Sequence, residues 1–350
     1  MRLLFYYLLS CIVLQVLFAG SLAQSDQKIG VVDFNGREVE VSGNITSIVS
    51  LDPDATRILI ALGAGDLIKG VEATSKSCPV TNRVFPQVQA LPDVGSASQG
   101  TLSLEKLAKI KPDVVFLRGL HQDTAEKIQS ELKIPCVCTY GSVKDVEDYL
   151  KTIRIIGKTV SRENRSAEIS DLIEDKMAEI NNIVSSVPDS QKKRVLYIAP
   201  PFTKDLLRVI YNQHLSVYNA GGINVAYSGD KISSGSGPWK SVSLEQVAGW
   251  DPDMIFIHGL SFIGVQDVLN NSDWKDLRAV KDQKVYKVFA VSTGYDPSMI
   301  VLSTMQMAKI MYPDRLNFDF QKEADQVCQQ IYGVGGLPEF MESEYGITRT

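Results

Sequence analysis

The sequence has 350 residues, of which 44% are hydrophobic and 22% are charged, so it can build sizeable cores and exceeds the usual length of one compact domain. Two domains are therefore expected. The formal net charge of -5 argues against a nucleic-acid-binding protein, which would usually present a basic face.

The N-terminus has the pattern of a cleaved secretory signal. A basic residue precedes an apolar stretch at residues 3–18, and small residues follow at Ser21 and Ala23. We expect a signal peptide over residues 1–23, which would place the mature chain in the periplasm or the extracytoplasmic cell envelope. A retained membrane anchor is the alternative, although the apolar run is shorter than the about 20 residues that a membrane-spanning helix needs.

The first half of the mature chain is predicted to form an α/β lobe. Residues 45–51 are typical of a buried strand, and residues 55–62 are typical of a helix that Gly63 ends. Residues 101–120 then contain a Ser that can cap a short helix, a Pro-Asp stop and an apolar strand. An unbroken apolar strand after a helix indicates a buried parallel sheet.

Four cysteines follow the predicted signal peptide, which is too few for a disulfide framework in so long a chain. Cys136 and Cys138 lie two residues apart in a predicted strand, so their side chains would share one face. We interpret them as small buried core residues, with a metal or redox pair as the alternative. The disulfide state of Cys78 and Cys328, and of this pair, is left open by the sequence.

One long helix is predicted between the two halves of the chain, at residues 162–187. Seven apolar residues at helical spacing form a stripe along it, and neither Gly nor Pro interrupts it before Pro188. At 1.5 Å per residue it would be about 39 Å long. A single stiff helix predicts only a small opening between the two lobes.

The second half of the chain repeats the first. Residues 241–260 align with residues 101–120 at a constant offset of 140, and nine of the twenty positions are identical. Further strands and a helix alternate around this copy, so we predict an α/β fold with two similar α/β lobes and a ligand cleft between them. The lobes would span residues 24–161 and 188–350.

Together these features resemble the periplasmic binding proteins for ferric siderophores, haem and cobalamin, the TroA-like group with a helical backbone. The resemblance implies a monomer that is not an enzyme and that delivers its ligand to the permease dimer of an ABC importer. It indicates the architecture and the partner, whereas the ligand varies among members. The segments that carry it are residues 32–39, 45–51, 62–65, 103–105, 111–113 and 311–314.

The cleft of such a protein is built from loops at the carboxyl ends of the strands. Arg118 and His258 hold equivalent places in the duplicated segment, so they would approach a ligand from opposite lobes. Cationic side chains would bind an anionic chelate, and aromatic rings would suit catecholate, porphyrin or corrin rings. An ordinary surface role is the alternative for each. The predicted ligand-binding residues are Arg83, Phe85, Arg118, His121, Phe202, Arg208, Trp239, His258, Phe262 and Tyr295.

The sequence favours a ferric siderophore over a bare metal ion as the ligand. It contains three histidines and neither an H-x-x-H nor an H-E-x-x-H spacing, so we predict no metal site and no cofactor. Haem or cobalamin is the alternative, since His258 or Tyr295 could be an axial ligand to haem iron. An exported two-lobed enzyme is the alternative of a different class, although no G-x-S-x-G or phosphate-binding loop is present.

Glu105 and Glu245 hold the same place in the duplicated segment, in the first turn of each short helix. The helix dipole stabilises a carboxylate there, which is a sufficient structural reason for both residues. The resemblance implies a further role, because proteins of this family present one glutamate on each lobe to arginines of the permease. We therefore predict that both glutamates dock the permease.

Overall fold

The computed structural model describes residues 28–141, 143, 145–201, 203–210, 215–227, 239–290 and 296–350. The predicted signal peptide and two of the predicted ligand-binding residues, Phe202 and Tyr295, lie outside this part of the chain. Within it, the search for a helix with the length and apolar character of a membrane span finds none.

The first lobe is built on a four-stranded parallel sheet with the strand order β4-β3-β5-β6. Nearly all residues of its two middle strands and of β6 are buried, as unbroken apolar runs predict for a sheet covered on both faces. A two-stranded hairpin precedes it. The strands are β1 (Lys28–Val32), β2 (Glu38–Ser42), β3 (Ile48–Ser50), β4 (Ile68–Val71), β5 (Val114–Arg118) and β6 (Cys136–Thr139).

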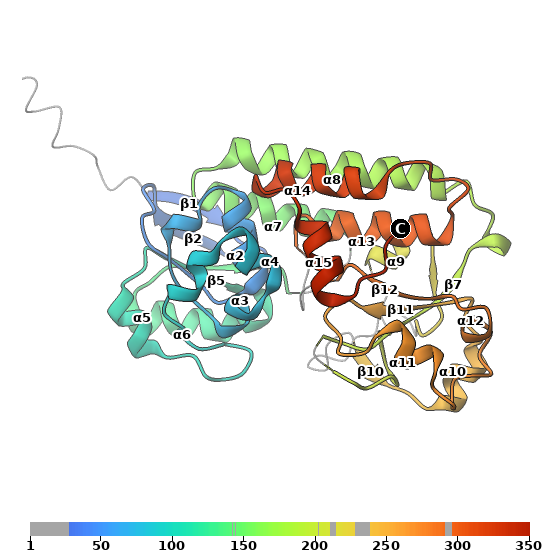
Figure 1. The fold of residues 1–350 in the computed structure, drawn as a ribbon. Helices are drawn as coiled ribbons and strands as arrows, with labels where there is room; N and C mark the ends of the chain where they lie inside the picture. The colour runs from blue at the N-terminus through green and yellow to red at the C-terminus, as the bar shows by residue number, and fades with distance from the viewer. Residues whose placement is uncertain are drawn as a thin grey trace, which may run out of the picture.

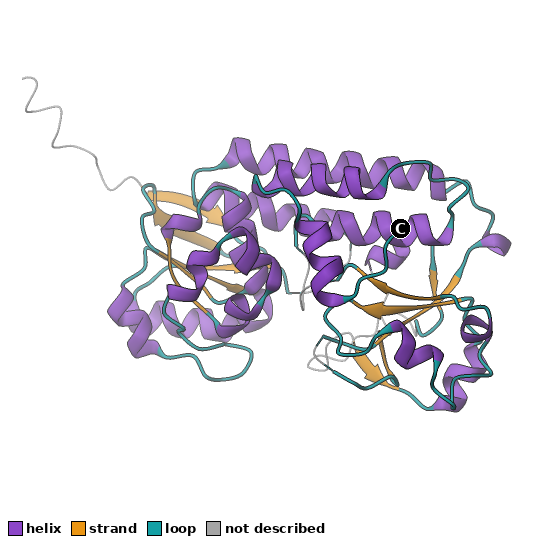
Figure 2. Cartoon of the chain, viewed as in Figure 1, coloured by secondary structure: helices purple, strands orange, loops and turns teal. Residues whose placement is uncertain are grey.

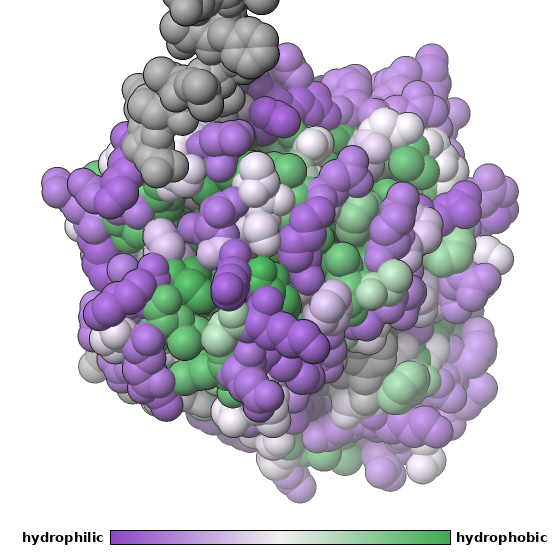
Figure 3. Space-filling view, turned by 90° about the vertical axis from the view of Figure 1, so that its left-hand side faces the viewer, coloured by the Kyte–Doolittle hydropathy of each residue, from purple (hydrophilic) through white to green (hydrophobic). Residues whose placement is uncertain are grey.

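Short helices connect and cover these strands. They are α2 (Pro53–Ala61), α3 (Ala73–Ser77), α4 (Pro79–Val84), α5 (Leu104–Ile110) and α6 (Gln122–Leu132), with 3-10 turns η1 (Gly65–Leu67), η2 (Pro86–Ala90) and η3 (Gly119–His121). The outer face of this lobe is mostly hydrophilic, with small hydrophobic areas between the polar side chains (Figure 3). Most of the large apolar residues of the lobe are buried in two core clusters.

The second lobe contains a six-stranded mixed sheet with the order β10-β8-β7-β11-β12, and β9 also pairs with β7. Strands β7, β11 and β12 run parallel to one another, whereas β8 is antiparallel to both of its neighbours, β7 and β10. The strands are β7 (Arg194–Ile198), β8 (Arg208–Ile210), β9 (Ile223–Asn224), β10 (Trp239–Ser241), β11 (Met254–His258) and β12 (Val285–Val288). Figure 2 shows the two groups of strands apart from each other, one in each lobe.

The duplicated segments have the same local structure in both lobes. Helix α5 and helix α10 (Leu244–Trp250) each begin after a capping serine, whose hydroxyl accepts a hydrogen bond of 3.2 Å from the backbone amide three residues later. Each helix ends at a left-handed residue, Lys111 or Asp251, and a buried strand follows. The repeat in the sequence is therefore a repeat in the structure.

The long central helix is α8 (Glu163–Val184), which has 22 residues and begins and ends slightly inside the predicted range. It runs along one side of both lobes and packs against α7 (Val146–Thr159) and α13 (Met299–Met311) (Figure 1). The other helices of the second half are α9 (Leu215–Asn219), α11 (Val265–Leu269), α12 (Arg278–Lys281), α14 (Phe320–Tyr332) and α15 (Leu337–Tyr345), with the turn η4 (Asp189–Gln191).

The last two helices, α14 and α15, cross from the second half of the chain to the first lobe, where they contact α2 and α4. Arg165 of α8 joins the same elements, because its guanidinium donates hydrogen bonds to the carbonyl oxygens of Ala61, Gln330 and Ile331 at 3.2, 2.6 and 3.0 Å. One cluster of buried apolar residues consequently extends through both lobes, from Val31 to Ile347. The two lobes are thus held by several helices, not by α8 alone.

The four cysteines of the described chain are buried, and none of them forms a disulfide there. Burial raises the pKa of Cys136 to about 12 and that of Cys138 to about 11. These thiols are therefore protonated at neutral pH, in agreement with the prediction that both are core residues.

Candidate ligand-binding site

Charged and polar side chains gather at the carboxyl edge of the first sheet. Asp52 follows β3 and caps α2 by accepting a hydrogen bond of 3.1 Å from the backbone amide of Asp54. Arg118 ends β5 and Thr139 ends β6, and parallel strands bring these ends to one edge. The Thr139 hydroxyl donates a hydrogen bond of 2.8 Å to Oδ2 of Asp52.

Arg118 is held in this cluster by two aspartates that are not among the predicted ligand-binding residues. Its Nε lies 3.1 Å from Oδ1 of Asp52, and its Nη2 lies 2.9 Å from Oδ2 of Asp54. Its guanidinium also lies over the ring of Tyr140, at 5.4 Å from the centroid. Burial opposes the charge of Arg118, but the two carboxylates outweigh it and raise its pKa. The side chain is 23% exposed, so part of this fixed cation remains in contact with solvent.

His121 lies near Arg118, as predicted for two residues of one loop. Its Nε2 is 2.9 Å from the hydroxyl of Ser98. Burial and, after it, the charge of Arg118 lower the pKa of His121, so the imidazole is neutral at neutral pH. It can therefore offer a hydrogen bond without adding charge.

Glu72 is a further member of this edge that sequence reasoning missed. It follows β4, is 4% exposed, and its Oε1 has no hydrogen-bond partner among the described residues. Burial and then the charge of Asp52 raise the pKa of Glu72 to about 7, although the hydroxyls of Ser96 and Thr74 and the cation of Arg118 oppose this. A substantial fraction of Glu72 is accordingly neutral at physiological pH and can donate a hydrogen bond.

Two of the predicted residues of the second lobe also come together, at the carboxyl end of its sheet. The ring of Trp239 lies 5.7 Å from that of Tyr197 in a stacked arrangement, and 6.0 Å from that of His258. His258 is 4% exposed, and its Nδ1 accepts a hydrogen bond of 3.1 Å from the backbone amide of Leu260. Tyr197 has no place in the sequence prediction, because it reads as one more apolar residue of β7.

The other predicted residues lie elsewhere. Phe85 is 8% exposed and packs in the hydrophobic core. Its ring lies so close to Gly65 that a Cβ atom at that position would be only 3.1 Å away. Arg83 is exposed on α4 and lies over the ring of Phe340 of α15, at 5.5 Å. Arg208 is exposed at the start of β8, and Phe262 is 61% exposed beyond β11. The structure therefore places Trp239 beside His258, and His121 close enough to Arg118 to feel its charge, but it does not bring all the predicted residues into one cluster.

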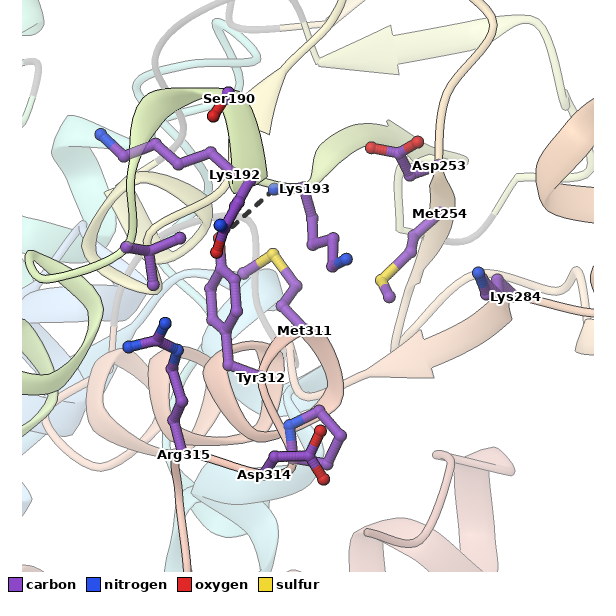
Figure 4. Close-up of a pocket in the computed structure, with 13 residues that line it drawn as sticks. Ser190, Lys192, Lys193, Asp253, Met254, Lys284, Met311, Tyr312, Asp314 and Arg315 are labelled. Carbon is purple, nitrogen blue, oxygen red and sulfur yellow. Dashed lines mark hydrogen bonds between the residues drawn. The ribbon is translucent and has the colours of Figure 1, made fainter.

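A surface pocket of about 530 Å³ lies at the opposite edge of the second sheet, beside the amino ends of β7 and β11. Figure 4 shows its lining, which includes Lys192, Lys193, Tyr312 and Arg315. The Tyr312 hydroxyl accepts a hydrogen bond of 3.3 Å from the backbone amide of Lys193 and donates one of 2.8 Å to the carbonyl of Gly221. Since strand carboxyl ends form ligand sites in open α/β sheets, we do not assign ligand binding to this pocket.

Glu105 and Glu245 are both exposed, on helices that lie on the side of the molecule away from α8 (Figure 1). The hydroxyl of Ser243 and the backbone amide of Glu245 lower the pKa of Glu245. The surroundings differ in charge. A pocket of about 320 Å³ beside Glu245 is lined by Leu244, Ala248, Leu277, Asp251, Asp273 and Asp276, whereas α5 and its cap carry Lys106, Lys109 and Lys111.

Two α/β lobes on a helical backbone, with polar residues at the carboxyl edges of both sheets, are the architecture of a two-lobed binding protein. A family model described as "Periplasmic binding protein" matches residues 48–290, and the chain belongs to this family. It is a substrate-binding protein of an ABC transporter, not an enzyme, and it works outside the cytoplasmic membrane. Its fold resembles that of a TroA-like periplasmic binding protein from Veillonella parvula, with a TM-score of 0.70 and 19% identity over 88% of this chain and 97% of that one.

Individual proteins resemble the chain in sequence or in fold. The molybdate-binding protein MolA of Haemophilus influenzae is 27% identical over 335 residues, which is 88% of this chain and 92% of the relative. The Fe(3+)-citrate-binding protein YfmC of Bacillus subtilis is 24% identical over 196 residues, 55% of this chain and 58% of the relative. A periplasmic solute-binding protein from Veillonella parvula has a similar structure, with a TM-score of 0.76 and 23% identity over 91% of this chain and 97% of that one.

Proposed function

We propose that the chain binds an anionic iron chelate, a ferric siderophore in the first place, between its two lobes and delivers it to the permease. The observation that carries this proposal is Arg118, which Asp52 and Asp54 keep cationic and fixed while 23% of its side chain stays exposed. A fixed guanidinium binds an anion through charge-assisted hydrogen bonds at a small cost in side-chain entropy.

The aromatic group of the second lobe favours a chelate over a small ion. Trp239 is the partly exposed ring of a cluster whose other members, Tyr197 and His258, are 0% and 4% exposed, so Trp239 is the ring available to stack on the ring system of a large chelate. Among the described residues, no group of three or more His, Cys, Asp or Glu side chains is arranged to hold a metal ion. Haem or cobalamin is the alternative chelate for the same aromatic group.

A compact oxyanion is the second candidate ligand. It is favoured by the similarity to MolA, a molybdate-binding protein, over 88% of this chain. The edge of the first sheet would suit it, because Arg118 supplies charge while His121 and the neutral form of Glu72 supply hydrogen bonds. Molybdate and a ferric chelate share negative charge and differ in size, so binding measurements can separate them.

The experiment is a calorimetric titration with ferric citrate, a ferric catecholate, sodium molybdate, haemin and cyanocobalamin. We expect one ferric chelate to bind per chain, and the Arg118→Ala variant to lose about 10- to 150-fold in affinity, the equivalent of about 1.5–3 kcal/mol for a hydrogen bond to a charged group. Arg315→Ala is the control, because this arginine lines the pocket at the opposite edge. Binding of molybdate alone selects the second candidate, and unchanged affinity in Arg118→Ala removes Arg118 from the site.

We further propose that Glu105 and Glu245 dock the permease. Both are exposed in the first turn of equivalent helices, on the side of the molecule away from α8 (Figure 1). Exposed carboxylates at two fixed positions suit a partner that presents cationic side chains at a matching separation.

A further inference from the structure

A chain of buried ion pairs leads from Arg118 to the second half of the protein. Asp54 contacts two arginines, since its Oδ2 lies 2.9 Å from Nη2 of Arg118 and its Oδ1 pairs with Nη2 of Arg57. Arg57 in turn contacts a second aspartate, because its Nε lies 3.1 Å from Oδ2 of Asp296. The side chains of Asp54, Arg57 and Asp296 are all 0% exposed.

Asp296 anchors the far end of this chain. Its Oδ1 accepts hydrogen bonds from the backbone amides of Ser298 and Met299, at 2.8 and 3.1 Å, where α13 begins. Its Oδ2 accepts a hydrogen bond of 2.6 Å from the hydroxyl of Tyr332 on α14. Asp296 belongs to the segment between β12 and α13, so the ion pairs connect the carboxyl edge of the first sheet with the second half of the chain.

The members of the chain depend on one another electrostatically. An isolated charge is costly to bury, so each of these groups needs the opposite charge of its neighbours. Interactions between charges are also stronger in the interior than in water. An anion that binds the exposed part of Arg118 competes with Asp54 for the same guanidinium. The attraction between Asp54 and Arg57 then becomes stronger. The attraction between Arg57 and Asp296 becomes weaker in turn.

We propose that Arg57 is a positioning residue that couples the ligand-binding guanidinium of Arg118 to Asp296 and the start of α13 across the two lobes. This inference rests on the proposed function, because it takes the ligand at Arg118 to be an anion. Arg57 itself is fully buried and does not contact the ligand. Its effect on binding is exerted through Asp54.

The coupling is tested first without any ligand, by urea unfolding of a double-mutant cycle. Arg118→Ala is combined with Asp296→Asn, an isosteric change that keeps Oδ1 as the acceptor for the α13 amides. No hydrogen bond or ion pair joins these two residues directly in the described structure. We expect the double variant to lose at least a third less stability than the sum of the single losses, whereas additive losses would overturn the proposal.

The control cycle combines Arg118→Ala with Asp253→Asn. Asp253 pairs with Arg278 at 2.9 Å and accepts a hydrogen bond of 2.8 Å from the backbone amide of Arg194, at the amino edge of the second sheet. It therefore belongs to the same lobe as Asp296 but has no place in the ion-pair chain. This cycle should be additive.

The second test measures the affinity for ferric citrate and sodium molybdate. Asp296→Asn removes a negative charge and leaves Arg57 freer to neutralise Asp54, so Arg118 is released toward the anion. We expect binding to become about 3- to 10-fold tighter in Asp296→Asn, which is about the upper end of the effect of one charged contact. The affinity of Asp253→Asn should stay unchanged. Arg57→Gln should weaken binding, and Arg57→Lys should restore much of it.

The outcomes separate the two proposals. A purely structural role of Asp296 predicts unchanged or weaker binding in a folded Asp296→Asn variant, and that result would overturn the coupling. If the wild-type protein binds neither anion, the proposed function fails for these ligands, while the unfolding cycle still decides whether Arg57 couples the two lobes.

Discussion

Asp52 is the residue whose replacement tests the site most directly. Its side chain is 0% exposed, and it carries three contacts: the cap of α2, the hydroxyl of Thr139 and the guanidinium of Arg118. Asp52→Ala removes all three. Loss of a helix cap costs about 1 kcal/mol, and leaving one partner of a buried ion pair alone costs about 3–5 kcal/mol. Because Arg118 keeps Asp54 as a second partner, we expect a total loss of about 3–5 kcal/mol.

Asp52→Asn separates the charge from the hydrogen bonds. The amide keeps an oxygen that can cap α2 and accept from Arg118, and its NH₂ group can donate to Thr139, whose hydroxyl also lies 3.2 Å from the carbonyl of Leu117. Only the charge of the contact with Arg118 is lost. We therefore expect a smaller destabilisation of about 1.5–3 kcal/mol, the range for a hydrogen bond to a charged group.

The assay is urea unfolding at pH 7, followed by circular dichroism, for both variants and for Glu40→Gln. Glu40 pairs with Lys28 at 3.3 Å, but the two side chains are 73% and 67% exposed, so the control should lose no more than about 1 kcal/mol. If Asp52→Ala proves as stable as the Glu40 variant, Arg118 is not held as the structure shows, and the argument for a fixed cation fails.

Three further predictions follow. The folded state raises the pKa of Glu72 from 4.5 to about 7, so stability is lost as pH rises from about 4.5 to 7. Denaturant unfolding should show the free energy of unfolding of Glu72→Gln rising relative to that of the wild type across this pH range. If the two proteins have the same pH dependence, the pKa of Glu72 is not raised. Changing Glu105 and Glu245 to Ala should abolish uptake while affinity and Tm stay the same. Glu163→Ala, in the first turn of α8, is the control, and normal uptake by the double variant would leave the helix dipole as the only role. Scattering profiles with and without saturating ferric citrate should nearly superimpose, because several helices join the lobes; a clear contraction would contradict this.

The parts of the fold that the sequence predicts are those with local patterns. A capping Ser, a Pro-Asp stop and an apolar run lie within about twenty residues of one another, so both copies of the duplicated segment could be recognised. The central helix follows from its apolar stripe. By contrast, the crossing of α14 and α15 to the first lobe depends on packing between distant segments, and no local pattern indicates it.

The sequence pattern singles out individual residues of the candidate site but not the contacts between them. Arg118 stands out because it follows a strand in a duplicated segment, yet its partner Asp52 is 66 residues away along the chain. Arg57 reads as a polar residue within an apolar helix, and its contact with Asp296 joins two halves that sequence patterns treat separately. Phe85 shows the converse error, because an aromatic residue next to a loop can equally be part of the core.

The first lobe can complete its packing only after the C-terminal helices α14 and α15 have been synthesised. A chain is synthesised from its N-terminus, so the surfaces of α2 and α4 exist long before α14 and α15 arrive to cover them. Until then, the apolar surface that these two helices cover remains exposed. The final thirty residues thus cover part of the N-terminal lobe. A chain truncated before them would leave that apolar surface exposed.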